Sequence, residues 1–169
     1  MAELNPPRSL RDDDPVEEFD CGRDSMNAWF RRHARRNHDA GISRVTVLTE
    51  AGTGTIVGYV SLSAGHIERE YLAKSARRNR PENIPAIFLG QLAVDRRFQG
   101  RGFARQLLLY ALKTCLALSR EIGCFAVLMH PLDDDVRAFY CRFGFEALPG
   151  DPRRSMAVRI TDLVHNGLQ

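Results

Sequence analysis

One stretch, residues 89–104, constrains the fold of this chain more than any other part of it. An apolar run ends at Val94, a charged turn follows, and the longest amphipathic segment of the sequence then begins. The spacing Arg97-x-x-Gly100-x-Gly102 therefore predicts a strand, a glycine turn and the start of a helix in immediate succession. In that arrangement backbone N–H groups converge at the positive end of a helix dipole, where phosphate oxygens bind.

Two familiar phosphate-binding loops do not fit this stretch. It lacks the Gly-x-x-x-x-Gly-Lys-Ser/Thr pattern of nucleoside-triphosphate loops. A dinucleotide fingerprint would require a third glycine at the position of Arg105. Two interpretations remain: a turn that binds a diphosphate, and a turn that only caps its helix.

The remaining elements alternate between helices and strands, which predicts an α/β or α+β fold. We expect residues 1–15 to be extended or loosely ordered, and residues 68–80 to form a short helix followed by an exposed basic loop. The other expected helices are residues 24–37, capped by Asp24 or Ser25, 101–121, and a helix capped by Asp133 or Asp134 that ends at Phe143. The expected strands are residues 45–49, 55–63, 85–94, 124–130, a short one from Phe145, and 155–160.

Length and composition are those of an ordinary globular domain. At 169 residues, with 44% hydrophobic and 27% charged residues, the chain is expected to be one domain spanning residues 1–169. No apolar run reaches membrane-spanning length and no apolar signal core begins the chain, so we expect a cytoplasmic protein without a membrane partner. The cysteines lie far apart, so we expect reduced thiols and no metal site; they are Cys21, Cys115, Cys124 and Cys141.

Basic residues are clustered although the net charge is only +3. One cluster surrounds the glycine turn, where a diphosphate would account for it. Two others need a different explanation: Arg31, Arg32, Arg35 and Arg36, and then Lys74, Arg77, Arg78 and Arg80. Basic patches on a nearly neutral protein favour a polyanionic partner.

The glycine turn, the Leu-Ala-Val strand before it and the segment Ala-Phe-Tyr-Cys-Arg-Phe-Gly-Phe at residues 138–145 together resemble the GNAT family of N-acetyltransferases. The resemblance implies a mixed, mostly antiparallel sheet flanked by helices, whose fourth and fifth strands splay apart. It also implies acetyl-coenzyme A as co-substrate, with its pantetheine arm in the wedge between those strands.

The same resemblance assigns residues to the coenzyme. The backbone of the strand would pair with the pantetheine amides, the turn would hold the pyrophosphate, and Phe139 would pack on the coenzyme or in the core. These cofactor-binding residues are Leu92, Ala93, Val94, Arg97, Gln99, Gly100, Arg101, Gly102, Phe103, Ala104, Arg105 and Phe139. Tyr140 would be the catalytic residue, a general acid for the leaving thiolate.

No residue is evident as a general base. His66 follows the second strand of the expected hairpin, and His130 ends the strand expected over residues 124–130. Each is open to two interpretations, a residue that faces the active-site cleft and a structural histidine. An α-amino group, with a pKa of about 7.7–8, needs little help from a base. The absence of an evident base in the sequence therefore favours an α-amine as the acetyl acceptor.

A narrower resemblance covers nearly the whole chain, including Phe-Asp-Cys-Gly at residues 19–22 and Asp-Val-Arg-Ala-Phe-Tyr at residues 135–140. These segments look like the GNAT toxins of type II toxin–antitoxin modules, the TacT- and AtaT-like toxins. That family implies acetylation of the α-amine of aminoacyl-tRNA, which stops translation. It further implies a homodimer and a cognate ribbon-helix-helix antitoxin, with promoter DNA bound only through the antitoxin complex.

The surplus arginines then have a use as contacts to tRNA phosphates. The expected tRNA-binding residues are Arg35, Arg36, Lys74, Arg77, Arg78 and Arg80. Two alternatives remain: a GNAT enzyme that acetylates a small-metabolite or protein amine, and a non-catalytic nucleic-acid-binding module. The second would leave Tyr140 and the glycine turn unexplained.

Overall fold

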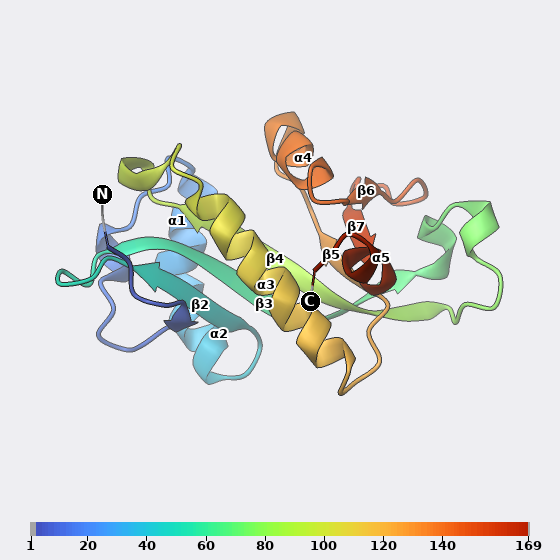
Figure 1. Cartoon of the computed structure of the whole chain (residues 1–169), viewed down its shortest axis with the longest axis horizontal. Helices are drawn as coiled ribbons and strands as arrows, with labels where there is room; N and C mark the ends of the chain where they lie inside the picture. Colours follow the sequence, from blue (N-terminus) through green and yellow to red (C-terminus); the bar gives the residue numbers. More distant parts are fainter. Residues whose placement is uncertain (1–2, 169) are drawn as a thin grey trace. The chain divides into compact units, whose positions relative to one another are not determined.

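The computed structural model describes residues 3–168, and the chain divides into two compact units, each assembled from separate segments. Unit 1 comprises Met1–Ser63 and Gly90–Ala111, and unit 2 comprises Ala64–Leu89 and Leu112–Gln169. Three elements, β3, β4 and α3, run from one unit into the other (Figure 1).

Seven strands form one sheet in the order β1-β2-β3-β4-β5-β7-β6, with β4 and β5 parallel and the β1–β2, β2–β3, β5–β7 and β6–β7 pairs antiparallel. The strands are β1 (Arg8–Ser9), β2 (Arg44–Thr49), β3 (Ile56–Glu68), β4 (Asn83–Val94), β5 (Ala126–Met129), β6 (Glu146–Ala147) and β7 (Met156–Arg159). The α-helices are α1 (Asp24–Trp29), α2 (Arg35–Asp39), α3 (Phe103–Ser119), α4 (Asp134–Cys141) and α5 (Ile160–His165). The predicted mixed, mostly antiparallel sheet flanked by helices is confirmed.

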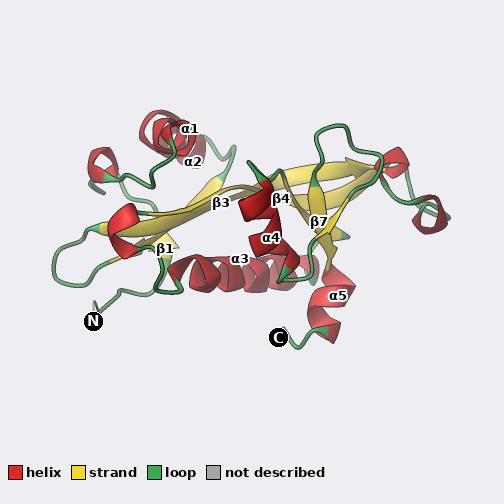
Figure 2. Ribbon diagram, turned by 90° about the horizontal axis from the view of Figure 1, so that it is seen from above, coloured by secondary structure: helices red, strands yellow, loops and turns green. Residues whose placement is uncertain are grey.

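Unit 1 packs helices on both faces of its strands. Figure 2 shows α1 and α2 on one side of β3 and the first part of α3 on the other. The close approach of α3 depends on Gly58, because a Cβ there would lie 2.7 Å from Leu107 Cδ1. Under α1, Phe30 stacks on Tyr59 with ring centroids 4.0 Å apart, and the Tyr59 hydroxyl donates to Met26 O at 3.0 Å.

The helix expected over residues 24–37 is present but differs in two ways. Its middle, Phe30–Ala34, is a π-helical turn between α1 and α2. Neither Asp24 nor Ser25 caps it: Asp24 is already in the first turn, Arg23 occupies the N-cap position, and that position makes no side-chain capping bond. An acidic residue in the first turn still interacts favourably with the helix dipole.

The amino-terminal segment runs along the sheet edge of unit 1. Arg8 and Ser9 form β1 and pair with Val47 and Thr46 of β2. The Arg8 guanidinium binds Asp14 through two hydrogen bonds of 2.7 and 2.9 Å. The sequence did not reveal β1, since two residues are too few to show a period.

Unit 2 is built around β5, whose four residues are all buried, as its continuous apolar run predicts. The pairing of β4 with β5 runs from Ala86↔Ala126 to Phe88↔Leu128, while β4 itself continues to Val94. Asp133 caps α4 as predicted, accepting a 2.8 Å hydrogen bond from the Val136 amide. Gly144 follows α4 with φ of 89°, the left-handed conformation expected after a helix.

The short helix predicted within residues 68–80 is of the 3-10 type and occurs as two separate turns. β3 continues to Glu68, and two short 3-10 helices follow it, over Arg69–Tyr71 and Lys74–Ala76. The physical reason is the core of unit 2, which buries Ile67, Leu72 and Ile84. The amide of Arg69 also donates to Glu82 O at 2.9 Å, so backbone pairing extends to the end of the hairpin.

The described residues contain neither a membrane-spanning helix nor a metal-binding group. Across residues 3–168 no helix is long and apolar enough to cross a bilayer. Within the same part of the chain no three His, Cys, Asp or Glu side chains are grouped so that they could hold a metal ion.

Candidate active site

The glycine turn in unit 1 leaves its outer surface open. Gly100 and Gly102 have φ of 78° and 84°, a region that side-chain-bearing residues rarely adopt. A Cβ at either position would meet no atom within 4 Å. Both glycines are therefore required by backbone conformation, and the space in front of them is free for a ligand.

The start of α3 supplies hydrogen-bond donors beside that space. The Gln106 amide donates to Gly102 O at 3.1 Å, which is an i→i−4 bond at the beginning of the helix. The amides of Phe103, Ala104 and Arg105 precede it, in the turn where helix N–H groups lack intrahelical partners. Free amides at the positive end of a 17-residue helix suit a diphosphate, so the residues present fit a coenzyme A pyrophosphate.

Two of the predicted coenzyme-binding side chains brace the turn. Arg97 donates from Nε and NH2 to both carboxylate oxygens of Asp95, at 2.9 and 3.0 Å. Gln99 Nε2 donates to Val94 O at 2.8 Å and to Cys21 O at 2.9 Å. Arg101 and Arg105 are exposed at the turn, so they are the basic side chains in the best position to meet phosphate.

Asp95 and Asp20 are functional candidates that the sequence analysis missed. The side chain of Asp95 is only 1% exposed, and it also accepts a 3.1 Å bond from the Asp20 amide. Burial alone would raise the pKa of Asp95, but its hydrogen bonds from Arg97 and Asp20 hold that pKa below the usual value. Asp20 in turn binds Arg96, at 3.0 Å between Oδ2 and NH2.

These contacts give a structural meaning to the Phe-Asp-Cys-Gly motif at residues 19–22. The carbonyl oxygens of Asp20 and Cys21 accept hydrogen bonds from the Arg96 amide and from Gln99 Nε2, so the motif stabilises the conformation of the turn. The signal was present in the sequence as an unassigned motif. Its partner could not be read there, because the two segments lie about 75 residues apart.

The predicted strand residues lead directly into the turn. Ala93 and Val94 are buried and Leu92 is half-buried at the end of β4. Their side chains therefore pack in the core of unit 1 while the strand delivers its backbone to Asp95 and the turn. The close approach of Ala93 O to Gly58, 2.8 Å from a Cβ there, leaves no room for a side chain at Gly58.

Tyr140 lies in unit 2, on the last turn of α4, and is 4% exposed. Its ring contacts Phe139 and Phe145 edge-on, with centroid distances of 5.2 Å in both cases. Burial raises the pKa of the phenol far above its ordinary value. Tyr140 is therefore a protonated hydrogen-bond donor at any physiological pH. Phe139 is half-buried and lies under Arg142, 5.4 Å from its ring centroid.

The two histidines considered in the sequence occupy different settings. His66 is exposed on β3. His130 follows β5 and its Nδ1 shares a hydrogen bond with the Ser155 hydroxyl.

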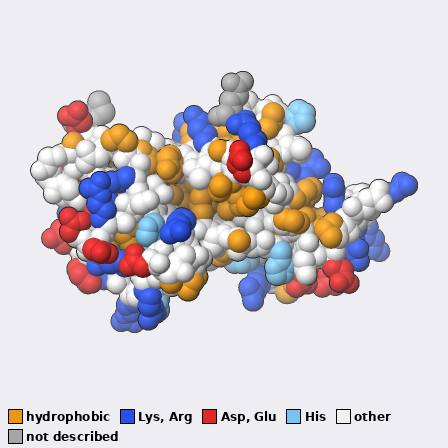
Figure 3. Space-filling view, turned by 90° about the horizontal axis from the view of Figure 1, so that it is seen from below, with side chains coloured by type: hydrophobic (Ala, Val, Ile, Leu, Met, Phe, Trp, Pro, Cys, Tyr) orange, Lys and Arg blue, Asp and Glu red, His pale blue; other side chains and the backbone are white. Residues whose placement is uncertain are grey.

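In unit 1, two of the arginines expected to bind tRNA have partners within the chain. Arg35 donates to Asp14 O at 2.7 Å, and Arg36 is hydrogen-bonded to His33 Nδ1 at 3.0 Å on an exposed surface. Figure 3 shows lysine and arginine side chains in separate groups on the face that it draws, with acidic side chains among them.

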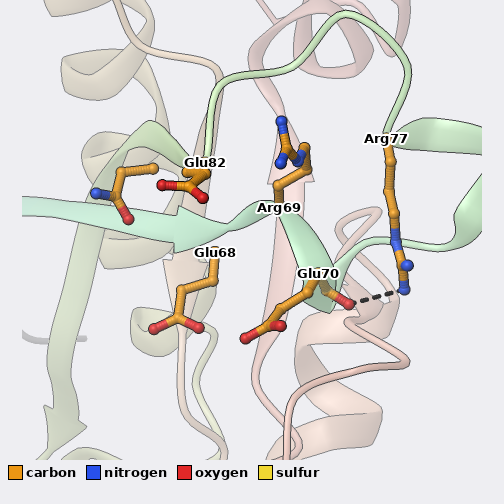
Figure 4. A pocket seen from close by; sticks show the side chains of 6 residues that line it. Glu68, Arg69, Glu70, Arg77 and Glu82 are labelled. Carbon is orange, nitrogen blue, oxygen red and sulfur yellow. Dashed lines mark hydrogen bonds between the residues drawn. The ribbon is translucent and has the colours of Figure 1, made fainter.

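In unit 2, the second expected tRNA-binding group splits into anchored and exposed residues. Arg77 donates to Leu72 O at 2.9 Å and to Glu70 O at 2.9 Å, and Figure 4 shows the second of these bonds. The Arg80 guanidinium lies 4.7 Å from the centroid of the Phe125 ring. Lys74 and Arg78 are exposed. Of this group, those two are the most available to a phosphate.

A pocket of about 410 Å³ lies beside Arg77 (Figure 4). Its lining residues are Glu68, Arg69, Glu70, Arg77, Glu82 and Asn83. Three of the six are carboxylates, which disfavours phosphate at this position. The carboxylates of the pocket therefore argue against a direct contact between Arg77 and a tRNA phosphate, which the sequence had predicted.

Comparison with known proteins gives consistent results. The family model for an acetyltransferase (GNAT) domain matches residues 41–147. A tRNA-acetylating toxin of Mycobacterium tuberculosis is 38% identical over 156 residues, which cover 92% of this chain and 93% of that protein. The structure of AtaT complexed with acetyl-methionyl-tRNAfMet has a TM-score of 0.88 and 28% identity, covering 97% of this chain and 99% of that one. A Tyr-to-Phe mutant of the AtaT toxin, bound to the C-terminus of the antitoxin AtaR and acetyl-CoA, has a TM-score of 0.80 and 25% identity over 99% of both chains.

Proposed function

The chain belongs to the GNAT acetyltransferase family, and from that premise we propose that it transfers the acetyl group of acetyl-coenzyme A to the α-amine of aminoacyl-tRNA. Acetylation there blocks translation, which makes the protein the toxin of a type II toxin–antitoxin system. The observation that carries the proposal is the 38% identity to a tRNA-acetylating toxin over 92% of this chain.

The glycine turn binds the coenzyme in this proposal. Amides at the start of α3 hold the pyrophosphate, with Arg101 and Arg105 adding positive charge. The backbone of residues 92–94 pairs with the pantetheine amides and places the Val94 N–H at the thioester carbonyl. Support comes from the positive φ of Gly100 and Gly102 and from the open space in front of them.

Acetyl transfer then needs orientation, oxyanion stabilisation and one proton for the leaving group. The neutral amine nitrogen forms a bond to the acetyl carbon and loses one proton, which ends in solvent. The carbon–sulfur bond breaks, the sulfur receives a proton from the Tyr140 hydroxyl, and solvent restores the proton of Tyr140. Burial of Tyr140 supports this role, because it keeps the phenol protonated until a strong acceptor forms beside it.

The acceptor tRNA is held by charge in this proposal. Arg36, Lys74 and Arg78 make the most accessible phosphate contacts, because all three are exposed. Arg35 in unit 1, and Arg77 and Arg80 in unit 2, contribute mainly through the segments that they hold in place.

The family also supplies the proposed partners. Residues 1–169 act as one cytoplasmic acetyltransferase domain that forms a homodimer. A ribbon-helix-helix antitoxin neutralises it, and promoter DNA binds only through the antitoxin complex. The structure of AtaT bound to the C-terminus of its antitoxin AtaR supports an antitoxin as a partner of this protein.

The test incubates the purified protein with acetyl-coenzyme A and a pool of charged tRNAs, followed by nuclease digestion and mass spectrometry. We expect acetyl-aminoacyl-adenosine from one or more tRNAs and none with Tyr140→Phe. Turnover on a metabolite or protein amine, with every aminoacyl-tRNA unmodified, would replace this proposal with the alternative acceptor.

A further inference from the structure

A hydrogen-bonded chain of three side chains lies at the carboxyl end of β5, all within unit 2. His130 follows β5 directly, and the adjacent strand β7 begins after Ser155. His130 Nδ1 and Ser155 Oγ are 2.5 Å apart, and the Ser155 hydroxyl also bonds to the Asp151 carboxylate. The antiparallel register explains the contact, because Met129 and Met156 are paired and the next residue of each strand end lies alongside.

The direction of each hydrogen bond follows from Asp151. Burial opposes its ionisation, but hydrogen bonds from the Ser155 hydroxyl and from backbone amides lower the pKa of Asp151. An ionised carboxylate only accepts, so the Ser155 hydroxyl must donate to it. Ser155 Oγ then accepts from His130 Nδ1–H. The chain therefore fixes the tautomer of His130 that carries its lone pair on Nε2.

The surroundings of His130 leave that second nitrogen open. Ser155 is fully buried and Asp151 is 8% exposed, whereas His130 is exposed. The Phe88 ring packs against the imidazole with a centroid distance of 4.9 Å. The charged groups that act on His130 are Asp151, which raises its pKa, and Arg153, which lowers it. Desolvation is the largest influence, and the pKa of His130 lies below its ordinary value.

His130 lies at the carboxyl end of the parallel pair β4–β5, where a side chain can reach a bound substrate. Phe88 and Leu128 form the last pair of the parallel β4–β5 ladder. His130 is two residues beyond Leu128 and therefore on the same face as Leu128 and Phe88. Ligands of sheets with parallel strands bind at the carboxyl ends of those strands. The segment after His130 leads into α4, which carries Tyr140 (Figure 1).

From this geometry we infer that His130 Nε2 is the general base of the acetyl transfer, with Ser155 and Asp151 as positioning residues. As the amine nitrogen bonds to the acetyl carbon it becomes acidic, and His130 takes one proton from it. The carbon–sulfur bond breaks and the sulfur takes its proton from Tyr140. The nitrogen of the neutral amine loses only this one proton. His130 then releases it to water, and water returns a proton to Tyr140, so both side chains end in their starting states. This inference rests on the proposed aminoacyl-tRNA acetylation.

The test measures kcat/KM on aminoacyl-tRNA against pH, from about 5 to 8, for the full-length protein. The reactive form needs a neutral amine, with a pKa of about 7.7–8, and a neutral His130. In a plot of log kcat/KM against pH, the wild-type curve should therefore fall with a slope approaching two at the acidic end. His130→Asn keeps a donor for Ser155 but has no base at the Nε2 position. It should lower kcat/KM roughly 100-fold near neutral pH and leave a slope of one.

Two further variants separate catalysis from structure. Ser155→Ala removes the tautomer control, so it should reduce the rate about threefold to tenfold and retain the slope of two. His165→Asn is the matched control on α5, where an exposed histidine is bonded to Thr161 O at 2.8 Å, and it should change neither rate nor slope.

The outcomes distinguish the inference from the function on which it rests. Suppose that the wild type acetylates aminoacyl-tRNA but His130→Asn keeps a slope of two, or keeps a rate within about threefold of wild type. Either result would overturn the role of His130 and leave the proposed function standing. A wild-type protein that acetylates no aminoacyl-tRNA would overturn the proposed function and this inference together.

Discussion

Tyr140 and Asp95 are both buried, yet burial has opposite consequences for their protons. Tyr140 has aromatic neighbours, so desolvation raises its pKa and the phenol stays protonated. Asp95 is also desolvated, but hydrogen bonds from Arg97 and Asp20 outweigh that effect and keep the carboxylate ionised. One residue is thus prepared to donate a proton, and the other to hold a turn in place.

Tyr140→Phe tests the proton donor. The phenylalanine ring keeps the contacts to Phe139 and Phe145, so we expect the melting temperature and the Kd for acetyl-coenzyme A to stay close to wild type. The rate of acetyl transfer should fall roughly 100-fold or more, as for loss of a general acid. Single-turnover kinetics and calorimetric titration measure the two quantities. A rate near that of wild type would rule out Tyr140 as the acid.

Asp95→Asn tests the brace behind the turn. The substitution leaves the Arg97 guanidinium without its carboxylate, so we expect a loss of about 1–3 kcal/mol in the free energy of unfolding at pH 7. The folded-state pKa of Asp95 is lowered, so its contribution is complete above the unfolded value of about 3.8 and disappears as pH falls through the folded value.

The difference in stability between wild type and Asp95→Asn should therefore shrink below about pH 3.8. Urea unfolding at a series of pH values measures it. Asp162→Asn is the control, because its partner Arg159 lies in a more exposed ion pair with 3.0 Å between Oδ1 and NH2. An equal effect of both substitutions at pH 7 would contradict the structural role of Asp95.

Among the elements of the structure, the glycine turn depends on backbone conformations that only glycine adopts readily. Gly102→Ala forces a side-chain-bearing residue to φ of 84°, which costs about 1–2 kcal/mol. The new methyl group would stand in the space reserved for phosphate. We expect the Kd for coenzyme A to rise at least about tenfold, measured by calorimetry, since each 1.4 kcal/mol is one order of magnitude.

Gly123→Ala is the matched control for the turn. A Cβ at Gly123 also meets no atom within 4 Å, and its φ is not in the left-handed region. Coenzyme affinity should be unchanged. If both alanine variants bound coenzyme A equally well, the pyrophosphate would have to bind elsewhere.

The segment of residues 69–80 separates structural arginines from exposed ones. Arg77 holds Leu72 O and Glu70 O, so Arg77→Ala should lower the melting temperature by several degrees. Lys74 and Arg78 are exposed, so their joint change to Glu should leave melting unchanged and weaken tRNA binding. The slope of log K against log salt should also become shallower, because phosphate contacts are lost.

Filter binding at several salt concentrations measures the tRNA affinity, and acetyl-coenzyme A affinity serves as the internal control. Weaker binding of both ligands in the Lys74/Arg78 variant would mean that the basic surface has been placed wrongly.

Local chemistry explains which elements the sequence could predict. The Asp133 cap, the buried β5 and the glycine turn before α3 depend on neighbours within a few residues, and all were predicted. Partners far along the chain were not. The sequence does not show that Gln99 meets Cys21, or that Arg77 is held by backbone carbonyls, because only the fold brings those atoms together. The extension of β3 was missed for the same reason.

At the scale of the whole molecule, the proposed reaction needs both compact units. Unit 1 carries the glycine turn and its brace, whereas unit 2 carries Tyr140 and the chain from His130 to Asp151. We propose that the coenzyme bound at the glycine turn receives its proton from Tyr140.

The most direct measurement is a crystal structure of the protein with acetyl-coenzyme A. We expect pyrophosphate oxygens to accept hydrogen bonds from amides of residues 100–105, within about 3.2 Å, and Tyr140 Oη to lie within hydrogen-bonding reach of the thioester sulfur. A coenzyme bound away from the turn, or a sulfur far from Tyr140, would contradict this proposal.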